Sequence, residues 1–280
     1  MNTLIPTDIE AVVRSALAED IGSGDITAGL VSAKTKVTAR IIGREGGVLC
    51  GIPWVTEVFS QLDDSIVIHW QVEDSDSFQP EQIIAELTGP ARAIMTGERT
   101  ALNFLQLLSG TASYTRSVAS RIAHTPTELL DTRKTLPGLR TAQKYAVRIG
   151  GGHNHRMGLF DAYLIKENHI ATFGRISEII STARTLMPGK AVEIEVQNLE
   201  QLREALAGEA DTILLDNFDI AGLREAVAIN QGRSKLEASG GIDEDLLVKI
   251  AETGVDYISI GALTKHCRAI DLSLLIQHVR

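Results

Sequence analysis

The chain has 280 residues, of which 44% are hydrophobic and 22% are charged, and its formal net charge is −9. This composition is typical of a globular protein with a sizeable core, and it excludes a disordered chain. Net acidity argues against nonspecific binding to nucleic acid or to an anionic membrane, because such binding depends on basic surface. The two cysteines, Cys50 and Cys267, lie far apart and outside any C-x-x-C pair, so a disulfide framework or zinc cluster is not expected.

No targeting or membrane segment is recognisable in the sequence. The first ten residues, MNTLIPTDIE, lack a basic region followed by an apolar one. No apolar run approaches the roughly 18 residues that a membrane span requires. We therefore expect a cytoplasmic protein that binds neither membrane nor nucleic acid.

The N-terminal part of the chain is predicted to contain helices and short strands. Thr7 and Glu10 match a capping box, and the apolar residues that follow share one helical face, which predicts a helix to about Gly22. Thr96 is the expected N-cap of a second helix over 97–108, whose end is marked by Gly110, and a third helix follows over about 112–123. Strand-like segments separated by Gly, Asp, Ser and Pro lie between the first two helices, at 37–42, 46–51, 65–72 and 82–87.

Beyond this part the chain repeats a short apolar strand, a polar residue at its end and a helical segment. Such repeats are typical of β/α units with a parallel sheet. Nearly every strand ends in a charged or small polar residue, which favours a barrel over an open sheet, because barrel strands converge on one mouth. With fewer than eight units, we predict an α/β fold with an N-terminal domain over 1–108 and an incomplete barrel over 109–280. The predicted barrel strands are 127–131, 162–165, 192–196, 212–216, 236–239 and 257–260.

A basic segment, residues 131–169, stands out in this acidic chain. It contains seven lysines and arginines and three histidines against three acidic residues, which indicates a binding site for a small anion. Helical spacing explains part of it, since Arg140, Lys144 and Arg148 fit a solvated helix face. It does not explain the cations beside strand ends or in the glycine-rich loop, which are Arg133, Lys134, His155, Arg156 and Lys166.

Small residues and carboxylates at later strand ends extend this prediction. Ser239-Gly240-Gly241 and Gly261-Ala262 follow the last two strands, where barrels commonly bind phosphate, although glycines there can simply turn the chain. Glu193, Glu195 and Asp216 lie on consecutive strands and could hold Mg²⁺, accept hydrogen bonds from ribose or stabilise a cationic transition state. They could equally cap helices or form ion pairs. A phosphorylated sugar accounts for both sets of residues.

Two other sites are possible in the basic segment. His153 and His155 alternate after three glycines, but without a third ligand nearby they are weak grounds for zinc, and anion contact by His155 and Arg156 is favoured. Lys166 could be a Schiff-base nucleophile. Neighbouring carboxylates favour its charged form, so a charged anion clamp is the better interpretation.

Long strings of the sequence resemble quinolinate phosphoribosyltransferases. They include EDIGSGDIT at 19–27, TGERTALNFLQLLSGTAS at 96–113, DTRKTLPGLR at 131–140 and KYAVRIGGGHNHRMGLFDAYLIKENHI at 144–170. Shorter matches are EIEVQN, LLDNF, EASGGI and DYISIGALT. The resemblance covers nearly the whole chain. It implies an N-terminal α/β sandwich followed by an incomplete, TIM-like α/β barrel, in a homodimer or an assembly of dimers.

The resemblance also implies an activity. The family joins quinolinate to 5-phosphoribosyl 1-pyrophosphate with Mg²⁺ present, giving nicotinate mononucleotide, pyrophosphate and CO₂ in de novo NAD synthesis. No organic cofactor is implied. A paralogue acting on another acid, and a metabolite sensor with a retired active site, remain alternatives. Retention of Glu195 and Asp216 argues against the sensor, which would gain nothing from these carboxylates.

By resemblance, quinolinate is held by Arg133, His155, Arg156 and Lys166, with Arg99 reaching in from the partner subunit. Lys134, Glu195 and Asp216 serve the sugar pyrophosphate, and the last two hold Mg²⁺, largely through the substrate. The implied catalytic residues are Lys134, Lys166, Glu195 and Asp216. The 5′-phosphate and the rest of the substrate fall to Thr132, Ser239, Gly240, Gly241, Ile260, Gly261 and Ala262.

The chain departs from the family pattern at two places. Lys265 stands where many members have a histidine, and His266 follows it, so no role is transferred to that position. Ser75 separates Asp74 from Asp76, where the family often has glycine. We interpret Ser75 as a tolerated surface change.

Overall fold

The computed structural model describes residues 5–279, which form two compact units. The first unit combines the chain up to Arg116 with Thr135–Gly151 and the segment from Ala262 onward, and the second consists of Ser117–Lys134 and Gly152–Gly261. The predicted sequence boundary between residues 108 and 109 stays a prediction. Within residues 5–279, no helix is both long enough and apolar enough to cross a membrane.

The first unit is built on a four-stranded antiparallel sheet. Its strands are β1 (Lys36–Gly43), β3 (Val67–Trp70), β5 (Ile83–Pro90) and β12 (Leu272–Val279), in the order β12-β1-β5-β3. A separate pair is formed by β2 (Gly47–Val48) and β4 (Ser77–Phe78). All four predicted strands are present, whereas β12, which brings the far end of the chain into this sheet, was not predicted.

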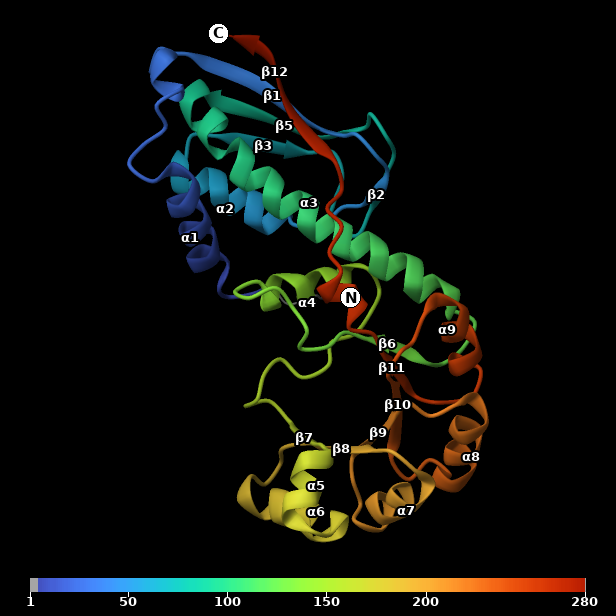
Figure 1. Ribbon diagram of the computed structural model, residues 1–280. Helices are drawn as coiled ribbons and strands as arrows, with labels where there is room; N and C mark the ends of the chain where they lie inside the picture. Colours follow the sequence, from blue (N-terminus) through green and yellow to red (C-terminus); the bar gives the residue numbers. More distant parts are fainter. Residues whose placement is uncertain (1–4, 280) are drawn as a thin grey trace. The chain divides into compact units, whose positions relative to one another are not determined.

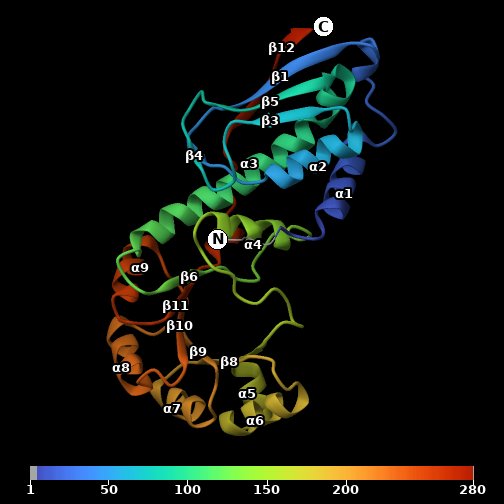
Figure 2. The same ribbon diagram turned by 180° about the vertical axis from the view of Figure 1, so that it is seen from behind.

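Helices cover one face of this sheet. They are α1 (Ile9–Ile21), α2 (Ile52–Leu62) and α3 (Ala91–Arg121), whose last turn from Ser117 falls in the second unit. Figures 1 and 2 show α2 and α3 on the same side of the strands. The short helices α4 (Arg140–Ile149) and α10 (Ala262–Lys265) belong to the same unit, together with the 3₁₀ turn at Ala28–Leu30. Trp54 packs against Tyr145 at 5.3 Å between ring centroids, which ties α4 into the core.

Four predictions about these helices are wrong. Thr96 is not an N-cap, because it lies inside α3 and its hydroxyl donates to Asp25 Oδ2 at 2.8 Å. The N-cap of α1 is Asp8, without a side-chain cap, so Thr7 and Glu10 form no capping box. The helix that was predicted to end at Gly110 continues as part of α3. Glycine fits this position because a Cβ there would lie 1.9 Å from the Arg268 carbonyl oxygen. Lys144 is not on a solvated face, since it is only 1% exposed in α4.

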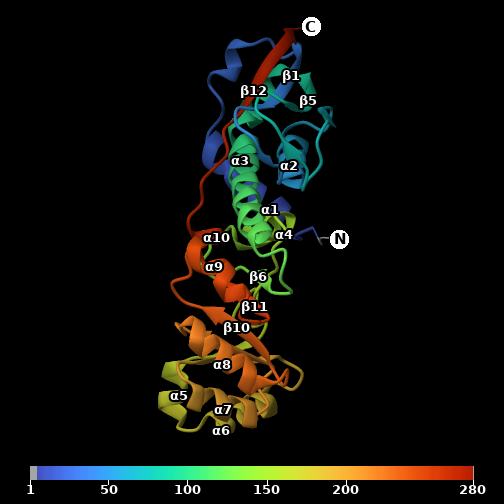
Figure 3. The same ribbon diagram turned by 90° about the vertical axis from the view of Figure 1, so that its right-hand side faces the viewer.

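The second unit contains a six-stranded parallel sheet in the order β6-β11-β10-β9-β8-β7. Because β6 and β7 are its two edges, the barrel is incomplete, as predicted. In Figure 1 the strands follow an arc with α7, α8 and α9 on its outer side, and Figure 3 shows α7 and α8 in front when seen from there. The six predicted strands correspond to β6 (Glu128–Leu130), β7 (Tyr163–Ile165), β8 (Val192–Val196), β9 (Thr212–Asp216), β10 (Lys235–Ser239) and β11 (Tyr257–Ser259).

Local sequence explains how the β/α units are joined. Asn198, Asp219 and Asp243 each accept backbone N–H bonds as N-caps, so helices start directly after the polar strand ends. Every residue of β8 is buried, with aliphatic side chains alternating with Glu193 and Glu195. The two glutamates therefore share the other face of that strand. The helices are α5 (Glu167–Phe173), α6 (Ile176–Leu186), α7 (Leu199–Ala207), α8 (Ile220–Asn230) and α9 (Glu244–Ala251).

Candidate active site

Most predicted site residues lie in the second unit, at or after the carboxyl ends of its strands. Arg99, in α3, and Ala262, the first residue of α10, belong to the first unit instead. Their roles stay predictions. The predicted site residues of the second unit, whose roles stay predictions as well, are Thr132, Arg133, Lys134, His155, Arg156, Lys166, Glu195, Asp216, Ser239, Gly240, Gly241, Ile260 and Gly261.

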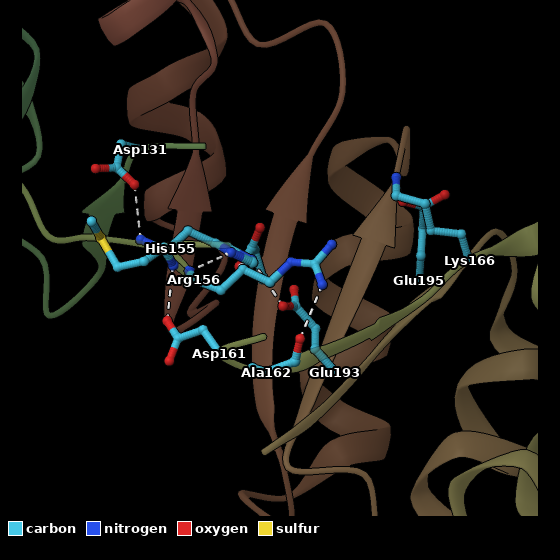
Figure 4. Close-up of polar contacts among 10 residues, drawn as sticks. Asp131, His155, Arg156, Asp161, Ala162, Lys166, Glu193 and Glu195 are labelled. Atoms are coloured by element: carbon cyan, nitrogen blue, oxygen red, sulfur yellow. Dashed lines mark hydrogen bonds and ion pairs between the residues drawn. The ribbon is translucent and has the colours of Figure 1, made fainter. Parts of the chain in front are cut away.

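Asp131, the buried residue that follows β6, holds the start of the loop that carries His155 and Arg156. Its carboxylate accepts the His155 backbone N–H at 2.9 Å (Figure 4). It also accepts the Asn154 side-chain amide at 2.6 Å. Further along, Asp161 accepts the backbone N–H of Met157 at 2.8 Å. A loop of glycines and polar residues is thus fixed by carboxylates at both ends. In the sequence, Asp131 was counted only as one of the three acidic residues of the basic segment. Its position after a strand could have identified it as a site residue.

Both ring nitrogens of His155 have partners inside the protein. Nδ1 accepts the backbone N–H of Arg156 at 2.8 Å, while Nε2 lies 2.8 Å from Glu193 Oε2 and 3.5 Å from Glu237 Oε2. The His155 side chain is only 12% exposed and Glu237 only 1%. Burial and repulsion from Glu193 raise the pKa of Glu237 to about 8. Glu237 was missed in the sequence because it stands inside a strand, not at its end.

Arg156 presents its guanidinium in the same place (Figure 4). Nη1 donates to the Ala162 carbonyl at 3.0 Å, and the buried Nε has no partner among residues 5–279. Burial and then the charge of Arg133 lower the pKa of Arg156. Two guanidinium groups close enough to repel each other form a site that an anion with more than one carboxylate would neutralise.

Lys166 forms a second charged group with Glu195. Lys166 Nζ lies 2.7 Å from Glu195 Oε2, and the lysine side chain is 46% exposed against 10% for the glutamate. Burial raises the pKa of Glu195 despite the hydrogen bond from Lys166, and Asp216 adds to the rise by repulsion. Because its amine is already engaged by a carboxylate, Lys166 fits an anion clamp better than a Schiff-base nucleophile.

The loop after β10 has a backbone that requires glycine. Gly240 and Gly241 have φ of 101° and 55°, and a Cβ on Gly240 would lie 2.2 Å from Asn217 Oδ1. Asn217 donates its backbone N–H to the Ser239 carbonyl at 2.9 Å and its amide to Asp216 at 3.0 Å. Asn217 therefore links the ends of β9 and β10. Its position directly after a strand-end aspartate could have identified it.

Lys134 lies beside the glycine that follows β11. A Cβ on Gly261 would approach Lys134 Cδ to 3.0 Å, so the bare backbone there lets the lysine stem pass. The Lys134 backbone N–H donates to Thr132 Oγ1 at 3.1 Å, which shapes the turn after β6. The predicted sugar-phosphate residues thus come from neighbouring strands, since β6 and β11 are paired.

Two clusters of side chains are candidate metal-binding sites. Glu195 and Asp216, the predicted Mg²⁺ ligands, are close enough for Asp216 to raise the pKa of Glu195, and paired carboxylate oxygens fit Mg²⁺. His155, Glu193 and Glu237 also bring ligand atoms within 4.8 Å of one another. His153 is not part of that group, because its Nδ1 instead lies 3.8 Å from Glu128 Oε2.

Comparisons with known proteins identify the family of the chain. The family model "Quinolinate phosphoribosyl transferase, N-terminal domain" matches residues 25–109, and "Quinolinate phosphoribosyl transferase, C-terminal domain" matches residues 111–275. A probable nicotinate-nucleotide pyrophosphorylase (carboxylating) of Bacillus subtilis is 41% identical over 257 residues, covering 91% of this chain and 89% of the relative. Mitochondrial quinolinate phosphoribosyltransferase (decarboxylating) 2b of Nicotiana tabacum is 39% identical over 96% of this chain and 82% of its own.

Solved structures extend the similarity to the whole fold. The nicotinate-nucleotide pyrophosphorylase from Francisella tularensis is 51% identical and covers 98% of each chain, with a TM-score of 0.93. That from Ehrlichia chaffeensis is 38% identical, with a TM-score of 0.91, over 99% of this chain and all of its own. With both domain models matched along the chain and relatives this similar, the chain belongs to the quinolinate phosphoribosyltransferase family.

Proposed function

We propose that the chain transfers the phosphoribosyl group of 5-phosphoribosyl 1-pyrophosphate to quinolinate and releases CO₂. The products are nicotinate mononucleotide and pyrophosphate, a step of de novo NAD synthesis. The observation that carries this proposal is that Arg156 lies close enough to Arg133 for the charge of Arg133 to lower its pKa. The same unit contains the Lys166–Glu195 ion pair. Cations for a diacid and carboxylates for a developing positive charge are both needed by this reaction.

Quinolinate has two adjacent carboxylates on a pyridine ring. Arginine suits such a ligand because its paired donors match a carboxylate, and Arg133 and Arg156 supply two guanidinium groups. Lys166 adds a point charge from the end of β7. We place the ring of quinolinate between these groups, with Arg99 of a partner subunit completing the cation set.

The sugar pyrophosphate has its own residues in the proposal. Lys134 contributes a cation, and the glycine-containing loops after β10 and β11 offer backbone N–H groups to the 5′-phosphate. Glu195 and Asp216 would hold Mg²⁺, largely through the substrate. When bound, Mg²⁺ would supply charge neutralisation for the departing pyrophosphate.

The chemistry explains the remaining carboxylates. As pyrophosphate leaves, positive charge develops at C1 of the ribose, and Glu195 and Asp216 can stabilise it electrostatically. Once the ring nitrogen carries ribose it is cationic, so the carbanion left at C2 by loss of CO₂ is stabilised as an ylide. No organic cofactor is required for either step. A cytoplasmic location stays a prediction.

The test is a product assay with purified protein, quinolinate, phosphoribosyl pyrophosphate and Mg²⁺. We expect nicotinate mononucleotide and CO₂ in equal amounts. Arg156→Ala should lower the rate by at least ~10²-fold, because a charge-assisted bond worth about 1.5–3 kcal/mol is lost and the partner carboxylate is left unpaired. Arg148→Ala, which alters an exposed cation of α4, is the matched control and should keep its activity.

Substrate choice separates this proposal from that of a paralogue. Nicotinate and other pyridine acids should be poor substrates in competition, since they cannot engage both arginines. Equal turnover of nicotinate, or no product from folded protein where a family member is active, would contradict the proposed function.

A further inference from the structure

Two buried carboxylates that the proposed mechanism leaves unused converge on His155. Glu193 comes from β8 and Glu237 from β10, while His155 lies in the loop before β7. Their Oε2 atoms lie 2.8 and 3.5 Å from His155 Nε2. Burying two carboxylates is costly unless they are hydrogen-bonded, so their presence at one ring nitrogen calls for a role.

The hydrogen bonds of His155 define its protonation. Nδ1 accepts the Arg156 backbone N–H at 2.8 Å, which requires a lone pair on that nitrogen. The ring proton therefore resides on Nε2, where Glu193 accepts it. In this state the imidazole is neutral, and neither nitrogen offers a donor to a bound anion.

Arg156 is held from two directions as a result. Its backbone N–H is bound to His155, and at the other end of the side chain Nη1 donates to the Ala162 carbonyl at 3.0 Å. Figure 4 shows His155 and Arg156 side by side, with Glu193 next to them. The first contact fixes the backbone at Arg156 and the second fixes its guanidinium, and both reduce the conformational entropy lost when the side chain binds a ligand.

We propose that Glu193 and Glu237 are positioning residues of the quinolinate site, which lock the His155 ring so that it fixes Arg156, and that His155 does not itself contact the acid. The inference rests on the proposed function and deepens it, because it redistributes the roles of residues around quinolinate. Glu193 accepts the ring proton, and Glu237 closes the other side of Nε2.

The first test separates binding of the acid from binding of the sugar. Glu193→Ala should raise KM for quinolinate by at least ~10-fold, equivalent to about 1.4 kcal/mol, and change KM for phosphoribosyl pyrophosphate by less than ~2-fold. Glu193→Gln should stay within about 3-fold of wild type, because its amide oxygen can accept the same ring proton. Glu200→Ala, an exposed glutamate on α7, is the control.

The outcomes distinguish the two proposals. A wild-type protein that forms no product refutes the proposed function, whatever the variants do. A wild-type protein that is active, with a Glu193→Ala variant of unchanged KM for quinolinate, overturns the positioning role. Equal loss toward both substrates overturns it too, because it indicates a general structural defect. If Glu193→Ala does not fold, Glu237→Ala replaces it, with an expected rise of at least ~3-fold in KM for quinolinate only.

A second test observes the ring directly. Nitrogen-15 NMR of histidine-labelled protein, assigned with His155→Gln, should show His155 neutral with its proton on Nε2, both free and with saturating quinolinate. Appearance of an imidazolium on quinolinate binding would mean direct contact with the acid and would overturn the inference. A divalent metal that copurifies with the wild type and is lost in Glu237→Gln would also overturn it, because the cluster would then be a metal site.

Discussion

Ser75 carries the clearest strain among the surface residues. It has φ of 83° between Asp74 and Asp76, in a turn closed by the Asp76 N–H on the Glu73 carbonyl at 3.1 Å. That position of such a turn favours glycine, because a Cβ is disfavoured at positive φ. The interpretation of Ser75 as a tolerated surface change is therefore incomplete. The side chain is exposed, but the backbone at Ser75 is strained.

We predict that Ser75→Gly stabilises the protein. Relief of left-handed strain gains about 1–2 kcal/mol, and the greater freedom of glycine in the unfolded chain returns up to about 1 kcal/mol. The net gain of about 1 kcal/mol should raise the melting temperature by roughly 2 °C. Ser77→Gly, in β4, should lower it instead, because glycine weakens a strand. Identical shifts for both variants would contradict the strain at Ser75.

Glu237 gives the protein a pH-dependent stability. Its folded pKa of about 8 exceeds the ordinary 4.5, so the folded state binds a proton that the unfolded state releases. The associated stability is complete below about pH 4.5 and is lost as the pH rises through 8. Between pH 5 and pH 9 the wild type should lose more than about 1.4 kcal/mol relative to Glu237→Gln, the worth of one pKa unit.

Melting curves across that pH range check this expectation. Glu200→Gln serves as the control, because Glu200 is exposed on α7, and its curve should run parallel to that of the wild type. A Glu237→Gln curve that is also parallel would show that Glu237 is already ionised when folded. At the residue scale, the sequence thus identified Glu193 by alternation within a strand, but it could not pair it with Glu237, since that contact depends on the curvature of the sheet.

At the scale of elements, periodicity predicted every strand of the parallel sheet. Each of these strands is a short apolar run that ends in a polar residue, and tertiary contacts reinforce this local signal. Helix ends were less predictable. Gly110 looked like a helix end, yet its lack of a side chain serves the close approach of the Arg268 carbonyl, a contact 158 residues along the chain.

Strand β12 also could not be assigned from local sequence. It pairs with β1 from Gly43↔Leu272 to Val37↔Val279, with one irregularity, and so belongs to a sheet whose other strands precede the six-stranded sheet in sequence. Its residues read equally well as a further barrel segment. Only its long-range pairing with β1 decides which sheet β12 joins, and local sequence patterns do not encode that pairing.

At the scale of the whole molecule, the proposed dimer predicts that two inactive variants restore activity when they are mixed. Arg99 lies in the first unit and Arg156 in the second. If a site takes Arg99 from the partner, a heterodimer of Arg99→Ala and Arg156→Ala chains has one intact site, so mixing the two should restore up to roughly half of the activity per heterodimer.

The control mixes Arg133→Ala with Arg156→Ala. Both residues lie in the second unit, so each site of that heterodimer lacks one arginine and activity should not return. Chain exchange is verified by tagging the two variants differently before the assay. Restoration in neither mixture, from verified heterodimers, would contradict a site shared between subunits.

The pairing of β12 with β1 also affects how the chain folds on the ribosome. Strands β1, β3 and β5 emerge early, but β1 lacks its second neighbour until the whole six-stranded sheet has been synthesised. During that interval β1 has an unpaired edge, and such edges invite association with other chains. Completion of the earliest sheet is thus coupled to a strand that is made after the six-stranded sheet, and synthesis must outpace aggregation of nascent chains.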